Sequence, residues 1–541
     1  MSPLSPSAAH SARRPASVAF VGAGPGDPSL LTLAAVAALE SADVVVTDQL
    51  TKASLVAAHA RPDVEVVDAS HGTHGQPLTH ASRAKIVVQA AKAHPGGRVV
   101  RLMDGDPTTF NGLAEEALAC RKAGITVDIV PGVTAVTAVP AYAGIPLTSP
   151  GASAVHVIAA GDSGADYARS VDPRTTVVLL GNAAALAGAL VALADAGRDP
   201  ATPVALTEQG TTTRQCTHTT DLAHAATVVA TLGHPSLAVV GPTVALREQL
   251  SWFESKALYG WRVLIPRTQD QAGSAVALLA AHGAGADVVP TISVEPPRTP
   301  HQMDRAIKGL VTGRYEWVGF TSVNAVKAVR ERFEDFGLDA RAFAGLKVAA
   351  VGGVTAEALR AWGINPDLVP TGEKSARGLL SDWPEYDADL DPINRVFLPR
   401  ADIATDTLAA GLQEMGWEVE DATAYRTVRA APPAPEVREA IKSGDFDAVV
   451  FTSSSTVRNL VGIAGKPHPS TVIACIGPAT AKTAEEHGLR VDVLAPEASV
   501  ASLIEALAEY GRALARQAHE AGVPVLRPSA RRKVASRRKA R

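Results

Sequence analysis

Short apolar runs alternate with longer Ala- and Leu-rich stretches along most of the chain. Residues 18–21, 43–46 and 99–102 are runs with the length and valine content of buried strands. Residues 126–130 and 155–160 continue the series, and stretches with helical periodicity lie between the runs. Strands that alternate with helices predict an α/β fold with largely parallel sheets.

The same pattern indicates where the domains begin and end. Residues 246–260 form a mostly helical pattern, and a new strand pattern starts at Arg262. We therefore expect one domain over 17–255 and a second over 260–513.

The second half of the chain contains an internal repeat. Arg-Val-Leu-Ile-Pro-Arg at 262–267 recurs as Arg-Val-Phe-Leu-Pro-Arg at 395–400. Later segments recur in the same order, with Phe-Thr-Ser at 320–322 and 451–453 and a turn-and-helix pattern at 349–356 and 474–481. Such a repeat indicates a duplicated α/β lobe. Two similar lobes that face each other form a cleft, which is a common place for a ligand.

The overall composition is that of an ordinary globular protein. The 541 residues are 46% hydrophobic and 20% charged, with a net charge of -4, so no global basic field favours nucleic acid or a membrane. No apolar run is as long as a membrane helix. Cys120, Cys216 and Cys475 are too far apart for a disulfide framework or a zinc site, which favours a reducing cytoplasm. We expect residues 1–16 to be a disordered leader and residues 527–541 a disordered basic tail.

A glycine-rich turn, Gly22-Ala-Gly-Pro-Gly-Asp27, follows the first predicted strand. Its third glycine comes one position too early for the Gly-x-Gly-x-x-Gly fingerprint of dinucleotide-binding folds. A clean second βαβ unit with its acidic residue is also missing, which disfavours the alternative of a nucleotide-dependent oxidoreductase. A tight turn that needs positive φ would explain the glycines without any ligand.

Further motifs follow this turn in a fixed order. They are Leu30-Leu-Thr-Leu33, Ala42-Asp-Val-Val-Val-Thr-Asp48, Val100-Arg-Leu-Met-Asp-Gly-Asp-Pro107, Val130-Pro-Gly-Val-Thr-Ala135, Pro140-Ala-Tyr-Ala-Gly-Ile-Pro-Leu-Thr148, Thr202-Pro-Val-Ala205 and Gly210-Thr-Thr-Thr-Arg-Gln215. As an ordered set, from about Ser17 to Ser255, they resemble the tetrapyrrole methyltransferase family, specifically uroporphyrinogen-III C-methyltransferase.

The resemblance implies two α/β subdomains with S-adenosylmethionine bound between them. It also implies a catalytic role for the acidic residue Asp48, and a homodimer formed through the N-terminal domain. The implied cofactor-binding residues are Pro25, Asp104, Gly105, Asp106, Thr109, Thr134, Ala135, Leu180 and Gly210. Gly-rich loops allow close approach of a ligand, and carboxylates accept hydrogen bonds from ribose hydroxyls.

Several basic residues of the family pattern are absent. The family's Gly-Arg-Gly-Gly-Glu-Glu reads Asn-Gly-Leu-Ala-Glu-Glu at 111–116, its Thr-His-Arg-Gly reads Thr-Ser-Pro-Gly at 148–151, and a family lysine falls at Ser70. An octacarboxylate substrate needs cationic partners, because unpaired buried carboxylates are costly. One alternative is therefore a synthase whose N-terminal half is a scaffold or a cofactor-sensing module.

Three histidines, His71, His74 and His80, cluster in a Gly-containing segment. No cysteine or acidic partner has metal-ligand spacing, so an exposed loop is favoured over a metal site. These histidines could also replace part of the missing basic charge.

In the second half, each repeated strand ends in a Pro-Arg pair, with Arg267 and Arg400. Ligands of open α/β sheets bind beyond the carboxyl ends of strands, so the two arginines could bind carboxylates from opposite lobes. Hydroxyl residues that follow other strands are N-caps by default, but helix starts also attract carboxylates. These candidate substrate-binding positions are Thr321, Ser322, Thr355, Thr452, Ser453 and Thr480.

Over about Gly260 to Ala513 these features resemble uroporphyrinogen-III synthase. The resemblance implies two α/β lobes joined by a pair of strands, with lobe one from 260–297 and 428–513 and lobe two from 298–427. It implies cyclisation of hydroxymethylbilane with inversion of the last ring, and no cofactor. The implied catalytic residues are Tyr425, Thr480 and Ser322. From pattern alone, Tyr425 is equally explained as a buried strand tyrosine.

The favoured hypothesis is thus a bifunctional cytoplasmic enzyme that makes uroporphyrinogen III and methylates it towards precorrin-2. Its expected partners are small polycarboxylate tetrapyrroles, and the sequence does not distinguish heme, siroheme or cobalamin as the end product.

Overall fold

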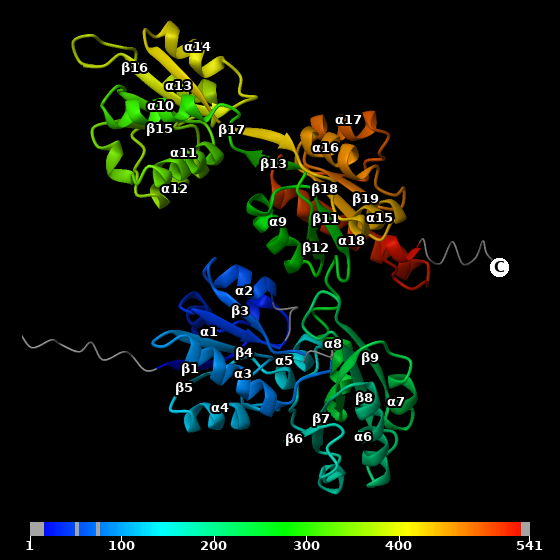
Figure 1. Ribbon diagram of the computed structural model, residues 1–541. Coiled ribbons are helices and arrows are strands. Elements are labelled where there is room, and N and C mark those ends of the chain that lie inside the picture. Colours follow the sequence, from blue (N-terminus) through cyan, green and yellow to red (C-terminus); the bar gives the residue numbers. More distant parts are fainter. Residues whose placement is uncertain (1–15, 49–52, 72–75, 532–541) are drawn as a thin grey trace, which may run out of the picture. The chain divides into compact units, whose positions relative to one another are not determined.

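The computed structural model describes residues 16–48, 53–71 and 76–531 (Figure 1). They form two compact units, the first mainly from residues up to Arg262 and the second mainly from 263–276 and 286–507. The expected leader therefore lies almost wholly outside the described residues, as does most of the expected basic tail. No helix in the described part of the chain is long and apolar enough to cross a membrane.

The first sheet of the N-terminal unit is parallel, as the sequence pattern predicts, with the order β3-β2-β4-β1-β5. Its central strands carry buried valines, which favour a sheet covered on both faces. The strands are β1 (Ser17–Gly22), β2 (Val44–Thr47), β3 (Glu65–Asp68), β4 (Arg98–Met103) and β5 (Thr126–Val130). The helices are α1 (Leu33–Glu40), α2 (Ala53–His59), α3 (His80–Ala93) and α4 (Leu113–Lys122), and α5 (Ala135–Tyr142) leads to the next sheet.

The second sheet corrects the prediction of largely parallel sheets. Only β6 and β7 run parallel, and β7-β10-β8-β9 are antiparallel neighbours. Among the described residues, no helix lies between β8 and β9, as an antiparallel pair allows. The strands are β6 (Ala154–Ala159), β7 (Thr175–Leu180), β8 (Pro203–Glu208), β9 (Cys216–Asp221) and β10 (Pro235–Val240). The helices are α6 (Ala183–Asp195) and α7 (Leu222–Val229).

The segment 246–260 is much less helical than its pattern predicts. Only α8 (Arg247–Leu250) is α-helical there, after a short 3-10 helix. Instead, the Trp252 ring packs edge to face on Tyr142 and the Phe253 ring packs on it at a tilt, with ring centroids 5.1 and 4.8 Å from that of Tyr142. Aromatic packing against α5 therefore replaces the periodic helical face.

A third sheet has the order β12-β11-β18-β19-β20, and the pairs from β11 to β20 are parallel. Its strands are β11 (Arg262–Ile265), β12 (Gly285–Val288), β18 (Ala448–Phe451), β19 (Val472–Cys475) and β20 (Val493–Leu494). The helices of this lobe are α9 (Gln269–Ala281), α15 (Pro435–Ser443), α16 (Ser454–Ala464), α17 (Pro478–Glu486) and α18 (Val500–Glu520).

A fourth sheet has the order β13-β17-β16-β14-β15. Its strands are β13 (Ile292–Glu295), β14 (Trp317–Phe320), β15 (Lys347–Ala350), β16 (Arg395–Ala401) and β17 (Glu418–Arg429). The helices are α10 (Pro300–Val311), α11 (Val323–Asp335), α12 (Gly353–Ala361), α13 (Ala376–Asp382) and α14 (Thr407–Glu414).

Strand β17 is long because it has two different partners. Residues from Glu418 to Tyr425 pair with β16 in parallel, and Arg426 to Arg429 pair with β13 in antiparallel. The register shifts between Arg400 and Ala401, opposite Thr423 and Tyr425. Tyr425 is thus the residue at which the strand changes partner.

The internal repeat is visible in the sheets, but the two sequence copies do not each form one lobe. The repeated strands lie in the order β11-β18-β19 in one sheet and β16-β14-β15 in the other. The first copy therefore supplies β11 to one lobe and β14 and β15 to the other. Equivalent strands occupy equivalent places, although the chain visits them in a different order.

The first residues of the expected disordered tail are ordered. Residues 528–531 form a helical turn, and the Ser529 backbone N–H donates to Asp447 Oδ1 at 2.9 Å. Ser529 is buried, so this turn packs onto the lobe that carries β18.

Candidate active sites

Three loops of the first sheet meet beyond the carboxyl ends of its strands. A Cβ atom at Gly22 would lie 2.6 Å from the carbonyl oxygen of Gly105 and 2.5 Å from Cα of Gly132. Gly24 and Gly105 exchange backbone hydrogen bonds of 3.2 and 3.0 Å. Gly105 has a φ of 55°, which favours glycine. The loops after β1, β4 and β5 therefore touch through main-chain atoms, where α/β sheets bind ligands.

Asp106 holds these loops together. Its Oδ1 accepts from the Thr108 N–H at 2.8 Å and from the Thr108 hydroxyl, and its Oδ2 accepts from the Gly132 N–H at 3.0 Å. Burial acts to raise the pKa of Asp106, but these hydrogen bonds hold it below its usual value. Its carboxylate is thus already engaged by the loops, which leaves main-chain groups to contact a cofactor.

Residues of the second subdomain complete the same region. The Asp27 N–H donates to the Thr211 hydroxyl at 3.1 Å, beside Gly26. Gln209 and Thr211, on either side of Gly210, have φ angles of 48° and 63°, a strained arrangement typical of functional turns.

The structure brings most of the predicted cofactor residues together. Thr134 caps α5 by accepting from the Val136 N–H, and Ala135 and Leu180 pack on one apolar cluster. Pro25, Gly105 and Gly210 lie in the loops just described, and Thr109 donates its N–H to the Asp106 carbonyl. The Asp104 carbonyl accepts from the Asn111 amide at 2.6 Å.

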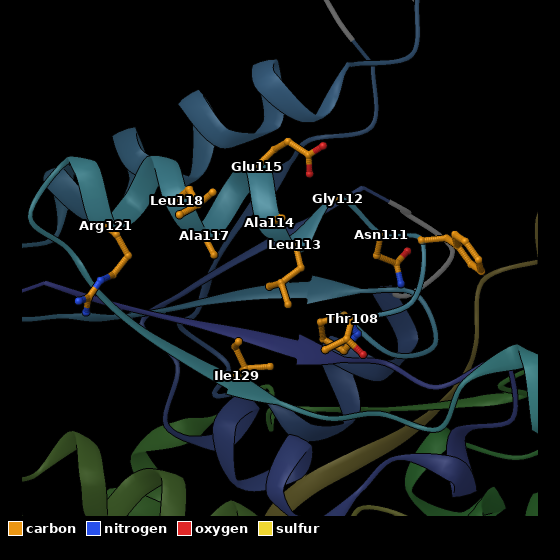
Figure 2. Close-up of a pocket in the computed structure, with 12 residues that line it drawn as sticks. Thr108, Asn111, Gly112, Leu113, Ala114, Glu115, Ala117, Leu118, Arg121 and Ile129 are labelled. Atoms are coloured by element: carbon orange, nitrogen blue, oxygen red, sulfur yellow. The ribbon is translucent and has the colours of Figure 1, made fainter. Parts of the chain in front are cut away.

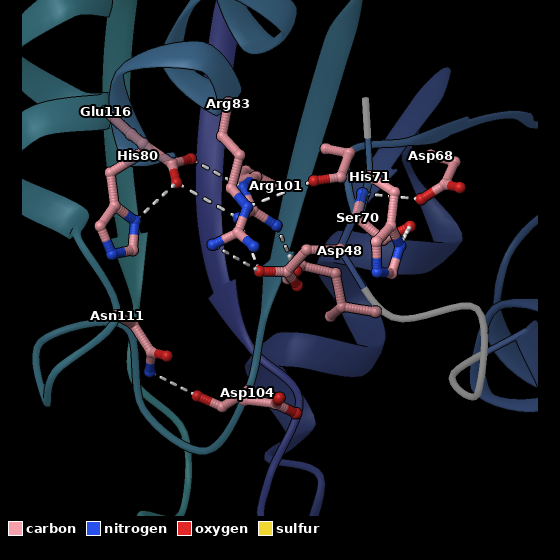
Figure 3. A network of polar contacts seen from close by, with 12 residues as sticks. Asp48, Asp68, Ser70, His71, His80, Arg83, Arg101, Asp104, Asn111 and Glu116 are labelled. Carbon is pink, nitrogen blue, oxygen red and sulfur yellow. Dashed lines mark hydrogen bonds and ion pairs between the residues drawn. The ribbon is translucent and has the colours of Figure 1, made fainter. Parts of the chain in front are cut away.

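A buried network of charges lies beside these loops (Figure 3). Arg101 is fully buried, and its guanidinium donates to both oxygens of Glu116 at 2.7 and 3.2 Å and to Asp48 at 3.2 Å. Arg83 lies 3.5 Å from the same Asp48 oxygen, and His80 lies 3.7 Å from Glu116. Carboxylates and basic side chains therefore alternate along the network.

Asp48, the predicted catalytic acid of this domain, is held as an anion. Burial acts to raise its pKa, but Arg101 and Arg83 keep the pKa below its usual value. Among the described residues, its Oδ1 is buried without a hydrogen-bond partner. This environment makes Asp48 a weak base and a fixed negative charge.

A shallow apolar cavity of about 400 Å³ lies on α4 and β5 (Figure 2). Phe110, Leu118 and Ile129 line it and are exposed, and Glu115 and Arg121 add opposite charges. Exposed apolar groups of this kind mark interaction surfaces.

A cavity of about 950 Å³ lies between elements of the second unit, lined by α9, α11, β13 and β17. Arg267 and Gln271 line it from the start of α9, Lys327 from α11, and Tyr425 from β17. Arg267 forms no ion pair among the described residues, and burial lowers its pKa. Its uncompensated cation suits a carboxylate ligand.

Tyr425 and Ser322 are joined in the same region. Their hydroxyl oxygens are 3.0 Å apart, and Ser322 also caps α11 by accepting from the Ala325 N–H at 3.1 Å. Tyr425 is 7% exposed. The cap fixes Ser322, and Ser322 in turn orients the tyrosine hydroxyl.

The structure does not bring Arg400 to this cavity. Its guanidinium pairs with Asp406 at 2.9 Å and with Asp421, so its charge is already neutralised. The other hydroxyl candidates are likewise absent from the described residues that line the cavity, and Ser453 is used in the capping box of α16. These candidates are Thr321, Thr355, Thr452, Ser453 and Thr480.

Sequence reasoning missed Lys327 and Gln271. Each lies near the start of a helix that follows a motif, Lys327 in α11 after Phe-Thr-Ser and Gln271 in α9 after Pro-Arg. The i, i+4 spacing from Arg267 to Gln271 was the available signal. His71, His80 and the other described His, Cys, Asp and Glu residues form no group of three that could hold a metal, and His74 lies outside the described residues.

Comparison with known proteins also divides the chain into two domains. Residues 17–226 match the family model of the tetrapyrrole (corrin/porphyrin) methylases, and residues 273–505 match that of uroporphyrinogen-III synthase HemD. The chain therefore combines one stretch that matches the methylase family with another that matches the synthase family. It is a two-domain enzyme of tetrapyrrole biosynthesis, with a methylase domain and a synthase domain.

The chain is 29% identical over 506 residues to the porphyrin biosynthesis protein HemD of Ruminiclostridium josui, covering 91% of this chain and 98% of that protein. It is 39% identical over 243 residues to siroheme synthase 2 of Aeromonas hydrophila, covering 44% of this chain and 51% of that protein. The chain thus spans about half the length of this siroheme synthase.

Among solved structures, a uroporphyrin-III C-methyl transferase from Thermus thermophilus, complexed with S-adenyl homocysteine, is 32% identical. The match covers 42% of this chain and 99% of that one, with a TM-score of 0.36. The methylase family binds S-adenosylmethionine.

Proposed function

We propose that the synthase domain cyclises hydroxymethylbilane to uroporphyrinogen III with inversion of the last ring. We propose further that the methylase domain C-methylates this product to precorrin-2 with S-adenosylmethionine. The observation that carries the first step is the cavity shared by Arg267, Lys327 and Tyr425, whose hydroxyl is held by Ser322. The meeting of the loops at Gly22, Gly105 and Gly132 carries the second.

In the synthase domain, Arg267 and Lys327 bind carboxylates of the linear substrate from two sides of the cavity. The Tyr425 hydroxyl donates a hydrogen bond to the hydroxyl that leaves the last ring, which generates the electrophilic azafulvene. The cavity then holds the floppy chain in the folded form that closes through a spiro intermediate, so positioning selects the isomer. We propose that this step needs no cofactor, and Thr480 stays a prediction from the family pattern.

In the methylase domain, the glycine loops fit a ligand that is held mainly by backbone groups, since side chains there would overlap the neighbouring loop. The bound S-adenosylmethionine supplies an electrophilic methyl group. Asp48 stabilises the positive charge that develops on the tetrapyrrole, because its ion pairs keep it anionic. Arg101 holds the Asp48 carboxylate in place.

One assay tests both steps. The full chain is supplied with hydroxymethylbilane, with and without S-adenosylmethionine, and the products are separated by isomer-resolving chromatography and mass. We expect the type III isomer without the cofactor and added methyl groups with it. The type III isomer alone, with the cofactor present, would favour a methylase domain that serves only as a scaffold or cofactor sensor. The type I isomer alone would overturn both steps.

We also propose that the enzyme is a homodimer through the apolar face of Phe110, Leu118 and Ile129 (Figure 2). Arg121 and Glu115 on this face could pair between two copies related by a two-fold axis. Light scattering should give a dimer for the wild type and a monomer for Leu118→Glu. An unchanged mass would contradict this interface.

We propose that the methylase domain spans residues 17–255 and the synthase domain residues 260–513. Lobe one of the synthase domain would then consist of 260–297 and 428–513. A cytoplasmic location and a siroheme, heme or cobalamin end product also stay predictions.

A further inference from the structure

The first turn of α3 brings two basic side chains to the place where the methylase pattern lacks them. We infer that His80 and Arg83 form a carboxylate-binding pair for the tetrapyrrole substrate of the methylase domain. This inference rests on the proposed methyl transfer. It places the basic side chains on helix α3, whereas the family pattern carries them in loops.

His80 occupies the space of the absent arginine side chain. In the segment 111–116 the arginine of the family pattern falls at Gly112, and a Cβ atom built on Gly112 would overlap the imidazole ring of His80. Gly112 has a φ of 70°, so this position now suits only a residue without a side chain. The His80 ring therefore fills the volume above Gly112 from the neighbouring helix.

Arg83 lies one helical turn after His80, on the same side of α3. Its Nε donates to the Ala69 carbonyl at 3.2 Å, directly before Ser70, where the family lysine falls. A cation from α3 thus lies next to the second position that has lost one.

The charges around this pair are already balanced. The bidentate contact with Arg101 neutralises Glu116, and Asp48 lies between Arg101 and Arg83. An incoming carboxylate therefore does not meet an unpaired negative charge. The side chain of His80 is 41% exposed and that of Arg83 is 17% exposed, so both reach the surface of the network.

The donor capacity of the two side chains is not exhausted within the described residues. Arg83 uses its Nε for Ala69 and has one long contact of 3.5 Å to Asp48, which leaves further guanidinium N–H groups for a ligand. Nδ1 of His80 is buried without a hydrogen-bond partner and faces Glu116 at 3.7 Å, so the exposed part of the ring is its other edge, which carries Nε2. A carboxylate at the surface of the network would accept hydrogen bonds from this edge of His80 and from the guanidinium of Arg83.

The test compares His80→Gln and Arg83→Gln in the full chain, with Lys85→Gln as the control. Lys85 is on the same helix and exposed, but it points to another face, so it loses the same charge without facing the network. The KM for uroporphyrinogen III should rise about tenfold in each of the first two variants, as for a lost hydrogen bond to a charged group. The KM for S-adenosylmethionine, the synthase activity and the Lys85→Gln variant should not change.

Titration with uroporphyrin III, the stable oxidised analogue, gives a second readout by fluorescence quenching, with the same tenfold loss expected. Arg83→Lys, which keeps the charge, should recover part of the affinity. If the wild type methylates and both variants keep KM and analogue affinity within twofold, the inference is overturned. Equal changes in both KM values with a lower melting temperature would show a structural role and also overturn it. If the wild type does not methylate, the proposed methyl transfer fails, and the analogue titration alone decides whether the pair binds.

Discussion

The methylase site is built mainly from main-chain atoms, whereas the synthase site is built from side chains. In the methylase domain, Gly22, Gly105 and Gly132 meet through main-chain atoms at the edge of the sheet. In the synthase domain, the cavity walls are side chains, among them Arg267 and Lys327. A site made of main chain keeps its form when surrounding side chains change, whereas a wall of cations depends on each residue.

This difference explains why the methylase motifs are preserved unevenly. The loops that fit the cofactor keep their glycines, because any side chain would overlap the opposite loop. The positions that carry arginines in the family pattern lack them here, which fits our proposal that His80 and Arg83 serve the same anionic groups from another element. We therefore expect substitutions at the main-chain site to lower stability and distort the loops. Substitutions at the side-chain site should mainly weaken substrate affinity.

The largest effect is expected for Arg101→Met in the methylase domain. The variant leaves Glu116 fully buried without its cation, and breaking a buried pair in this way costs about 3–5 kcal/mol. Thermal inactivation of methyl transfer should move to a clearly lower temperature, while synthase activity in the same chain stays. The control Arg61→Met breaks an exposed pair with Asp43, which contributes only about 0–1 kcal/mol. Equal losses in the two variants would contradict a stabilising role for the buried network.

A smaller loss of stability, with loss of methyl transfer, is expected for Gly132→Ala. The new methyl group would overlap the Gly105 carbonyl, and such overpacking costs about 1–3 kcal/mol. Because the overlap is with main chain, the loops must separate, and calorimetric binding of S-adenosylmethionine should be lost. Gly151→Ala, where a Cβ meets nothing within 4 Å, should bind normally. Normal cofactor binding in Gly132→Ala would show that the loops do not form the cofactor site.

The smallest effect distinguishes the two Pro-Arg pairs of the synthase domain. Arg267→Gln should raise the KM for hydroxymethylbilane about tenfold, because it removes an unpaired cation from the cavity. Arg400→Gln should change it less than twofold, since Asp406 and Asp421 already neutralise that arginine. Steady-state kinetics of the type III product measure both variants. Equal effects would restore the interpretation in which both arginines face the substrate.

The sequence was sufficient for the fold class and for most strands of the first sheet, since residues 18–21 and 44–46 are continuous apolar runs. The family resemblance also implied that Pro25 and Gly105 line one pocket, and in the structure their loops touch, because strand ends of a parallel sheet share one edge. Tyr425 and Arg267, which are far apart in sequence, were both noticed and both line one cavity.

Other features depend on contacts between segments that are far apart in the sequence. The side chain of Arg400 lies within reach of Asp406 and of Asp421 on the neighbouring strand, and only the sheet brings the latter close. Likewise, β7, β8 and β10 carry apolar runs that suit either strand direction, so the pattern could not show that this sheet is mixed. The exchange of strands between the two repeat copies is invisible to a linear comparison.

The double pairing of β17 has a mechanical consequence. The strand belongs to one neighbour before Tyr425 and to another after it, so any bending between the lobes of the synthase domain is concentrated near that residue. A residue at the hinge between two lobes moves less than the lobes themselves. The Tyr425 hydroxyl, which we propose to act on the substrate, can therefore keep its position while the cavity walls around it move to admit a long, flexible molecule.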